Sequence, residues 1–238
     1  DDGVHGRESY AQEYGAGNVY LIKDLVPGPE SSRPHGFRAY RGGGLFNATT
    51  LETGPELYWA GWTMGTSYSV RLVADVVPGP MGSNPQLVAV MGTVALFYAT
   101  TPQYGRELWS TMGTPETTAM VKDIFEGPGD SVPTSPRVLA TDHDAYIVAL
   151  TDVARGNCLW HYLAKDNSLR FVADVSENTQ HMALSNGHLL FAQEQPASGA
   201  ELWVYDGGDA PPRLLVDIIP GDKGANPAQL FAWKDVVF

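Results

Sequence analysis

The chain has 238 residues, of which 43% are hydrophobic and 18% are charged, so it can form one large β domain or two small ones around a sizeable core. The formal net charge of −12 argues against a surface that binds nucleic acid or anionic membrane, because such surfaces need clustered Lys and Arg. No apolar run reaches the roughly 18 residues of a membrane-spanning helix. The single cysteine, Cys158, excludes an intrachain disulfide, and we interpret it as a structural residue rather than a nucleophile.

Two short signatures recur along the chain, roughly 45 to 50 residues apart. The first is an acidic, an apolar and an aromatic residue in succession, with a cysteine replacing the acid in one copy: Glu56–Tyr58, Glu107–Trp109, Cys158–Trp160 and Glu201–Trp203. The second follows it and contains an aspartate: Asp24, Asp75, Asp123, Asp174 and Asp217. A repeat of this length predicts a propeller, a solenoid or an array.

The clearest repeat covers residues 83–128. Apolar stretches of strand length, separated by turns rich in Gly and Pro, predict strands at 87–90, 95–99, 106–110 and 119–124. Four short strands in each repeat are typical of one propeller blade.

The first and last segments of the chain resemble complementary parts of a repeat. Residues 1–30 match its third and fourth strands, and residues 223–238 match its first and second. We therefore expect one all-β domain, 1–238, that forms a five-bladed β-propeller of four-stranded antiparallel blades, closed by pairing of the N- and C-terminal strands in one blade. The other blades would be 31–81, 82–130, 131–179 and 180–222. For a longer protein, the alternative is that this chain is part of a six- or seven-bladed ring.

The segments Gly105–Thr114 and Met120–Ile124 resemble the ELWxTDGT-type (hyalin-like) β-propeller repeat of large secreted or surface proteins, many of them bacterial. Met112 departs from this pattern, since the family has an aspartate there. The resemblance implies the propeller fold and an extracellular or cell-surface location. It implies no catalytic motif.

If the blades are equivalent, the repeated acids form rings: Glu8, Glu56, Glu107 and Glu201, and Asp24, Asp75, Asp123, Asp174 and Asp217. Repetition argues against catalysis, which needs a pair of groups with different pKa values. We expect the aspartates to accept hydrogen bonds from turns and the glutamates to pair locally. Calcium bound by the aspartates is the alternative, and His143 in an Asp-His-Asp turn is a weaker metal candidate. We find no motif for a catalytic serine or for a nucleotide cofactor.

The repeated aromatic residues are expected to pack between blades: Tyr58, Trp109, Trp160 and Trp203. The alternative is a set of platforms for sugars. Trp59, Trp62 and Trp233 lie outside this pattern and are candidates for an exposed contact surface. The triplet Asn47–Thr49 is a possible glycosylation site.

These observations predict a non-enzymatic extracellular scaffold: a module of a larger surface, adhesion or filament protein that presents its loops to protein or glycan partners. One alternative is a multivalent lectin with one sugar site per blade. Another is an enzyme similar to a glycoside hydrolase, with a pair of carboxylates at the mouth of the channel. We expect no cofactor, no nucleic-acid partner and no membrane insertion.

Overall fold

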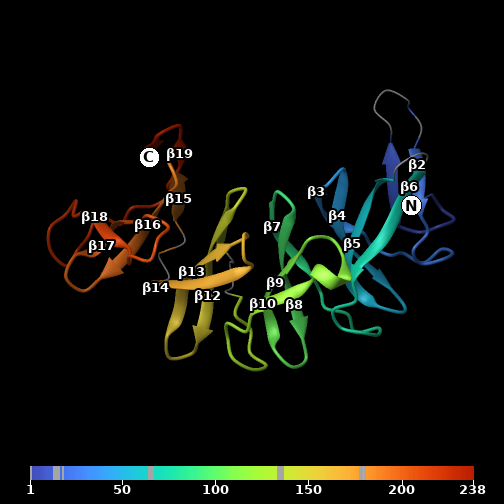
Figure 1. The fold of residues 1–238 in the computed structure, drawn as a ribbon, viewed down its shortest axis with the longest axis horizontal. Helices are drawn as coiled ribbons and strands as arrows, with labels where there is room; N and C mark the ends of the chain where they lie inside the picture. Colours follow the sequence, from blue (N-terminus) through green and yellow to red (C-terminus); the bar gives the residue numbers. More distant parts are fainter. Residues whose placement is uncertain are drawn as a thin grey trace. The chain divides into compact units, whose positions relative to one another are not determined.

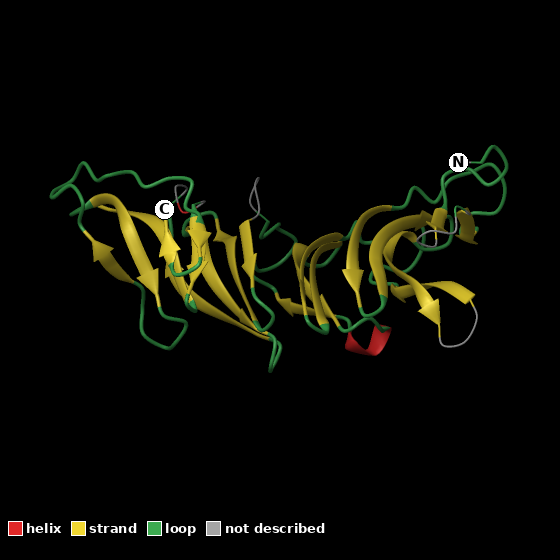
Figure 2. Ribbon diagram, turned by 90° about the horizontal axis from the view of Figure 1, so that it is seen from above, coloured by secondary structure: helices red, strands yellow, loops and turns green. Residues whose placement is uncertain are grey.

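The computed structural model describes residues 2–12, 17, 19–63, 67–132, 137–176, 179 and 181–238. These residues are almost entirely antiparallel β-structure, with a short 3-10 helix, η1, at Pro115–Thr117 (Figure 2). The chain divides into two compact units, Asp1–Asp123 and Ile124–Phe238. No helix in the described part of the chain is long and apolar enough to cross a membrane.

Unit 1 contains one two-stranded and two four-stranded sheets in its described residues (Figure 1). The small sheet pairs β1 (Ser9–Gln12) with β2 (Val19–Lys23). The next sheet has the order β3 (His35–Tyr40), β4 (Gly43–Thr50), β5 (Gly54–Thr63) and β6 (Ser67–Ala74). The last has the chain order β7 (Gln86–Met91), β8 (Val94–Thr101), β9 (Gly105–Thr111) and β10 (Ala119–Lys122).

Unit 2 contains two four-stranded sheets and one two-stranded sheet in its described residues. The first comprises β11 (Arg137–Ala140), β12 (Asp144–Asp152), β13 (Gly156–Leu163) and β14 (Ser168–Asp174). The second comprises β15 (Met182–Ser185), β16 (His188–Gln195), β17 (Gly199–Tyr205) and β18 (Arg213–Val216). The small sheet pairs β19 (Ala232–Trp233) with β20 (Val236–Val237).

The four-stranded antiparallel sheets confirm an all-β fold of propeller type. Strands β7 to β10 confirm the four strands predicted for residues 83–128. The two halves of the predicted closing blade are each present as a hairpin, β1–β2 and β19–β20, and the pairing of one hairpin with the other stays a prediction. Each of these pairs is a local hairpin, and β19 and β20 have only two residues each to offer to another strand.

Tight turns with left-handed backbone set the register of the sheets. Asn186 (φ 50°) and Gly187 (φ 79°) join β15 to β16, and Arg41 (φ 45°) and Gly42 (φ 74°) join β3 to β4. Two successive residues with positive φ form the turn whose twist matches that of antiparallel strands. These turns make each strand pair with its neighbour in sequence.

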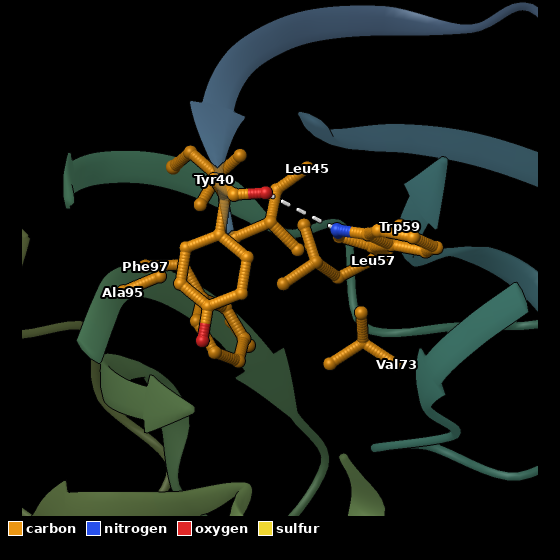
Figure 3. Packing of buried hydrophobic residues seen from close by; sticks show 9 residues of the cluster. Tyr40, Leu45, Leu57, Trp59, Val73, Ala95 and Phe97 are labelled. Atoms are coloured by element: carbon orange, nitrogen blue, oxygen red, sulfur yellow. Dashed lines mark hydrogen bonds between the residues drawn. The ribbon is translucent and has the colours of Figure 1, made fainter. Parts of the chain in front are cut away.

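The core of unit 1 fills the space between neighbouring four-stranded sheets. Figure 3 shows part of this cluster, in which Trp59 Nε1 donates a hydrogen bond to the Tyr40 carbonyl over 3.2 Å. Its buried members are Tyr40, Leu45, Leu57, Trp59, Val73, Leu87, Ala95, Phe97 and Ala99. Tyr58, adjacent to Trp59 on β5, packs on the other face of the same sheet in a second cluster with Phe46 and Val70. The sheet β3–β6 is therefore covered on both faces.

Unit 2 is built in the same way. A buried cluster lies between the sheets β11–β14 and β15–β18, and its members are Tyr146, Val148, Leu159, Met182, Leu189, Phe191 and Tyr205. His161 lies beside this cluster, with its ring stacked on Tyr146 at a centroid distance of 4.6 Å. Face-to-face packing of twisted sheets is the arrangement of propeller blades.

Candidate functional site

The repeated glutamates are anchors for loops. Glu56 is fully buried and accepts hydrogen bonds from the Val77 N–H over 3.1 Å and from the Ser83 hydroxyl over 2.6 Å. Glu8 accepts the N–H and the hydroxyl of Ser32 in the corresponding place. Each carboxylate thus fixes the loop that leads from its own sheet to the next one, because it satisfies loop donors that are buried away from water.

Glu107 and Glu201 are also fully buried. Glu201 accepts three backbone N–H groups, from Ile218, Ile219 and Ala225. Burial raises the pKa of Glu56 to about 7, against the opposing effect of the hydrogen bonds from Ser83 and Val77. The hydrogen bonds of Glu8, Glu56 and Glu201 thus hold loops in place.

The repeat with Cys158 in place of glutamate is completed from the neighbouring sheet. Gln193 of β16 accepts hydrogen bonds at Oε1 from the Ser176 N–H over 3.2 Å and from the Thr179 hydroxyl over 2.9 Å. Gln193 pairs with Glu201 across the sheet, at the position that Ala48 holds opposite Glu56. A longer side chain on one sheet thus replaces the carboxylate that the preceding sheet lacks.

The repeated aspartates do not gather. Asp24 accepts a hydrogen bond from the Gly28 N–H at 3.4 Å, and Asp174 pairs with Arg155, which lowers the pKa of its carboxyl. In the described part of the chain, no group of three or more His, Cys, Asp or Glu residues is placed to hold a metal ion. His143 is exposed in the turn between β11 and β12.

Three of the repeated aromatic residues pack against buried clusters between sheets, and Trp160 packs on Phe171 of its own sheet. Tyr58 is buried beside Phe46, and Trp160 is buried with its ring edge-on to Phe171. Trp109 and Trp203 are partly buried against the clusters of unit 1 and unit 2, respectively.

Two candidates from the sequence lie in the core instead of on the surface. Trp59 is 8% exposed, with the guanidinium of Arg71 over its ring at 5.0 Å. Asn47 is 5% exposed in the middle of β4, so a glycan cannot be attached there without disrupting the sheet. Both predictions were wrong, because the residues belong to a sheet covered on both faces. Trp62 and Trp233 are exposed, and their function as contacts stays a prediction.

Cys158 is fully buried, and burial raises the pKa of its thiol. Its Sγ lies 3.4 Å from Asp174 Oδ1. A buried thiol with a raised pKa is a poor nucleophile, which agrees with a structural residue.

A cleft in unit 1 is the candidate functional site. It has a volume of about 450 Å³ and lies between β2 and β6, and we call it the β2–β6 cleft. Its lining comprises Lys23, Leu25–Pro27, Thr50–Thr53, Tyr58 and Val70–Leu72. The volume lies within the range of small-ligand sites in proteins.

The cleft combines apolar walls with a polar border. Val70 and Tyr58 are buried in its wall, and Leu72 packs against the same apolar cluster. Along the β4–β5 turn, Thr53 Oγ1 lies 2.8 Å from Thr50 Oγ1 and 3.1 Å from the Tyr58 hydroxyl. These three hydroxyls form a hydrogen-bonded chain whose members can donate to or accept from a ligand.

Two edge strands border the cleft. In the described residues, β6 is the last strand of its four-stranded sheet and β2 is the last strand of its two-stranded sheet. An edge strand leaves alternate backbone N–H and C=O groups without a strand partner. The cleft can therefore hold an apolar side chain while the edge of β6 bonds to the main chain of an extended peptide.

The sequence contained a signal for the cleft in the comparison of its repeats. Thr53 precedes Gly54 just as Tyr104 precedes Gly105, and Tyr58 pairs with Phe46 just as Trp109 pairs with Phe97. At both positions the smaller side chain, Thr53 or Tyr58, lines the cleft.

No protein-family model and no curated protein matches the chain. Among solved structures it is similar to the acylaminoacyl peptidase of Pyrococcus horikoshii, with 11% identity and a TM-score of 0.44 over 79% of this chain and 27% of that chain. It is also similar to a puromycin-hydrolysing peptidase of Mycobacterium tuberculosis, with 12% identity and a TM-score of 0.44 over 90% of this chain and 32% of that one. A third is the β-propeller domain of the Trilobed protease from Pyrococcus furiosus, with 12% identity and a TM-score of 0.42 over 79% of this chain and 52% of that chain.

The chain spans about a third of the length of the first two peptidases. The expectation of a non-enzymatic scaffold is contradicted by these comparisons, since these three structures are two peptidases and a domain of a protease. These three structures do not test the lectin and glycoside hydrolase alternatives. The likeness concerns the fold, and neither substrate nor mechanism follows from it. The resemblance to the ELWxTDGT-type repeat and the extracellular location stay predictions.

Proposed function

We propose that this chain is the β-propeller part of an enzyme that hydrolyses peptides, and that the β2–β6 cleft holds a segment of the peptide. The observation that carries the proposal is the cleft itself, an apolar hollow bordered by hydroxyls and an edge strand. Its lining includes no histidine and no cysteine, so we assign binding to the cleft and bond cleavage to residues elsewhere in the enzyme.

The chemistry of the cleft favours a peptide over a sugar. Val70 and Leu72 alternate along β6, so both side chains reach the same side of the strand. An extended peptide beside β6 would alternate in the same way and would direct every second side chain into the hollow. A sugar needs several polar partners around its ring, whereas the walls here are mainly apolar.

The proposal is tested on the full-length protein with a mixture of unstructured peptides and mass spectrometry of the products. We expect cleavage, and we expect Leu72→Glu to lower kcat/KM about tenfold or more, because a charge would enter the apolar wall. Val153→Glu is the matched control, since Val153 is 86% exposed and lies in unit 2. Absence of cleavage, or equal loss in both variants, would refute the proposal.

We also propose that the ring closes with five blades, β19–β20 supplying the first two strands of the blade in which β1–β2 are the third and fourth. The support is the apolar surface that each pair leaves exposed: Trp233 and Phe238 near β19–β20, and Val19 and Tyr20 on β2. Apolar residues exposed together on a short strand are typical of a face that another element covers.

The register of the closing pair follows from the complete sheets. Trp233 pairs with Val236 as Ser185 pairs with His188, which makes Phe238 equivalent to Leu190. Leu190 pairs with Val204, three residues after Glu201, and the residue three after Glu8 is Ala11. Closure therefore places residues 11 and 238 opposite one another.

The doubly substituted chain Ala11→Cys, Phe238→Cys tests this register. Directly opposed residues on paired strands lie within disulfide range, so mild oxidation should form an intrachain bond. The control pair Val4→Cys, Phe238→Cys should not form one. A chain in which both pairs stay reduced, or form only intermolecular bonds, has no such closure.

A further inference from the structure

We infer that Thr53 and Tyr58 set the size of the side chain that the β2–β6 cleft accepts, and that the cleft selects peptides with a leucine- or phenylalanine-sized apolar residue. The inference rests on the proposed peptide-binding function and adds the selectivity of the site. It starts from a comparison of equivalent positions in two adjacent sheets of unit 1.

The equivalence is a matter of register. Thr50 pairs with Gly54 at the β4–β5 turn, and Thr101 pairs with Gly105 at the β8–β9 turn. The residue before each of these glycines is Thr53 in one sheet and Tyr104 in the other. The next sheet therefore carries a ring where the cleft has a hydroxyl and a methyl group.

The cleft also has the smaller side chain at the position of Tyr58. Tyr58 faces Phe46 across β4 and β5, and Trp109 faces Phe97 across β8 and β9. The cleft has the smaller aromatic ring of the two. Its two smaller side chains lie in contact, since Thr53 Oγ1 is 3.1 Å from the Tyr58 hydroxyl. Space and polarity at this border are thus set by one hydrogen-bonded pair.

The ligand follows from the walls and the volume. Val70, Tyr58 and Leu72 offer apolar surface, and a hollow of about 450 Å³ holds a large apolar side chain with part of its backbone. A small residue would leave the hollow partly empty. A charged one would lose its hydration against the apolar wall of Val70, Tyr58 and Leu72, while Lys23, Glu52 and Arg71 of the lining are exposed. Selection by size in an apolar pocket typically amounts to about ten- to two-hundredfold per methylene group.

The test uses five-residue peptides with a central Ala, Leu, Phe or Glu and measures binding to the full-length protein by calorimetry. The unmodified protein should bind the Leu and Phe peptides about tenfold or more tightly than the Ala peptide. Thr53→Tyr should abolish this preference, and Val153→Tyr, which adds the same ring at an exposed turn, should preserve it. Thr53→Ser, which keeps the hydroxyl without adding bulk, should preserve it as well.

Tyr58→Trp is a second variant that fills the cleft. It introduces the residue that the next sheet has at the equivalent position, Trp109, so we expect it to fold even if Thr53→Tyr does not. If the unmodified protein prefers apolar peptides but both filling variants keep the preference, the inference about Thr53 and Tyr58 is wrong and the binding function stands. If the unmodified protein binds no peptide at all, the proposed function itself has failed. A preference for Ala or Glu over Leu would overturn the selectivity.

Discussion

The Thr179 hydroxyl donates a hydrogen bond to Gln193 Oε1 over 2.9 Å, and this contact ties the loop between β14 and β15 to β16. Elsewhere the same kind of loop is held by a glutamate of the sheet before it, as Glu56 holds Ser83. Where Cys158 has replaced the glutamate, the sheet that follows supplies the acceptor.

This exchange makes a prediction about stability. Gln193→Ala should lower the free energy of unfolding by about 1 to 3 kcal/mol, because it leaves the buried donors of Ser176 and Thr179 without their acceptor. The double variant Cys158→Glu, Gln193→Ala restores the pattern of the other repeats and should recover most of the loss. Urea denaturation measures both values. A double variant less stable than the single one would show that the two positions do not substitute for each other.

Glu56 makes the stability depend on pH. Burial raises the pKa of its carboxyl from 4.5 to about 7, so the folded chain binds this proton more tightly than the unfolded chain does. The contribution is therefore present below pH 4.5 and is lost as the pH rises to 7, by up to about 3 kcal/mol. Glu56→Gln cannot ionise and should remove this decline. Denaturation midpoints measured between pH 4.5 and 8 should thus converge for the two proteins at the acidic end and diverge at the alkaline end.

His161 should act in the opposite direction. It is buried, and burial lowers the pKa of its imidazole although Asp144 Oδ1 lies 3.4 Å from Nε2. The unfolded chain then binds the proton more tightly, so the contribution is present above pH 6.5 and is lost as the pH falls below this value. His161→Gln should show a weaker loss of stability in acid. Thermal melting of both proteins at pH 5 and pH 7.5 measures the difference, and equal slopes would contradict the assignment.

Two glycines with the same backbone geometry should differ in their tolerance of alanine. Gly54 (φ 63°) has the Pro80 carbonyl oxygen 2.5 Å from the place of a Cβ, whereas Gly156 (φ 77°) has no atom within 4 Å of that place. Gly54→Ala should cost about 2 to 4 kcal/mol through both strain and collision. Gly156→Ala should cost about 1 kcal/mol through backbone strain alone. Chemical denaturation of the pair separates the two effects, and equal losses would exclude the collision at Gly54.

The repeat predicted the sheets well because period, strand length and turn residues agree with one another. Strands β7 to β10 fall where the apolar stretches of residues 83–128 place them. Burial was harder to predict. Trp59 lies beside Tyr58 on β5, and alternation normally sends such neighbours to one buried and one exposed face. Here both faces are covered by other sheets, so both rings are buried.

The cleft could not be predicted from the signatures, since they record what the repeats have in common. It depends on where they differ, at Thr53 and Tyr58 against Tyr104 and Trp109. The closing blade stays a prediction for another reason. Pairing of β19–β20 with the distant β1–β2 depends on long-range geometry, and β19 and β20 have only two residues each.

Gln193 has a consequence for the order of the repeats. A sheet that keeps its own glutamate can be followed by a sheet that has a small residue at the position equivalent to Gln193. Ala48 and Ala99 are such residues. The sheet with Cys158 has lost that freedom, because its loop is complete only when a glutamine comes next. Shuffling or duplicating this repeat alone would leave a loop unsupported, so sheets β11–β14 and β15–β18 should be inherited, exchanged and engineered as one module.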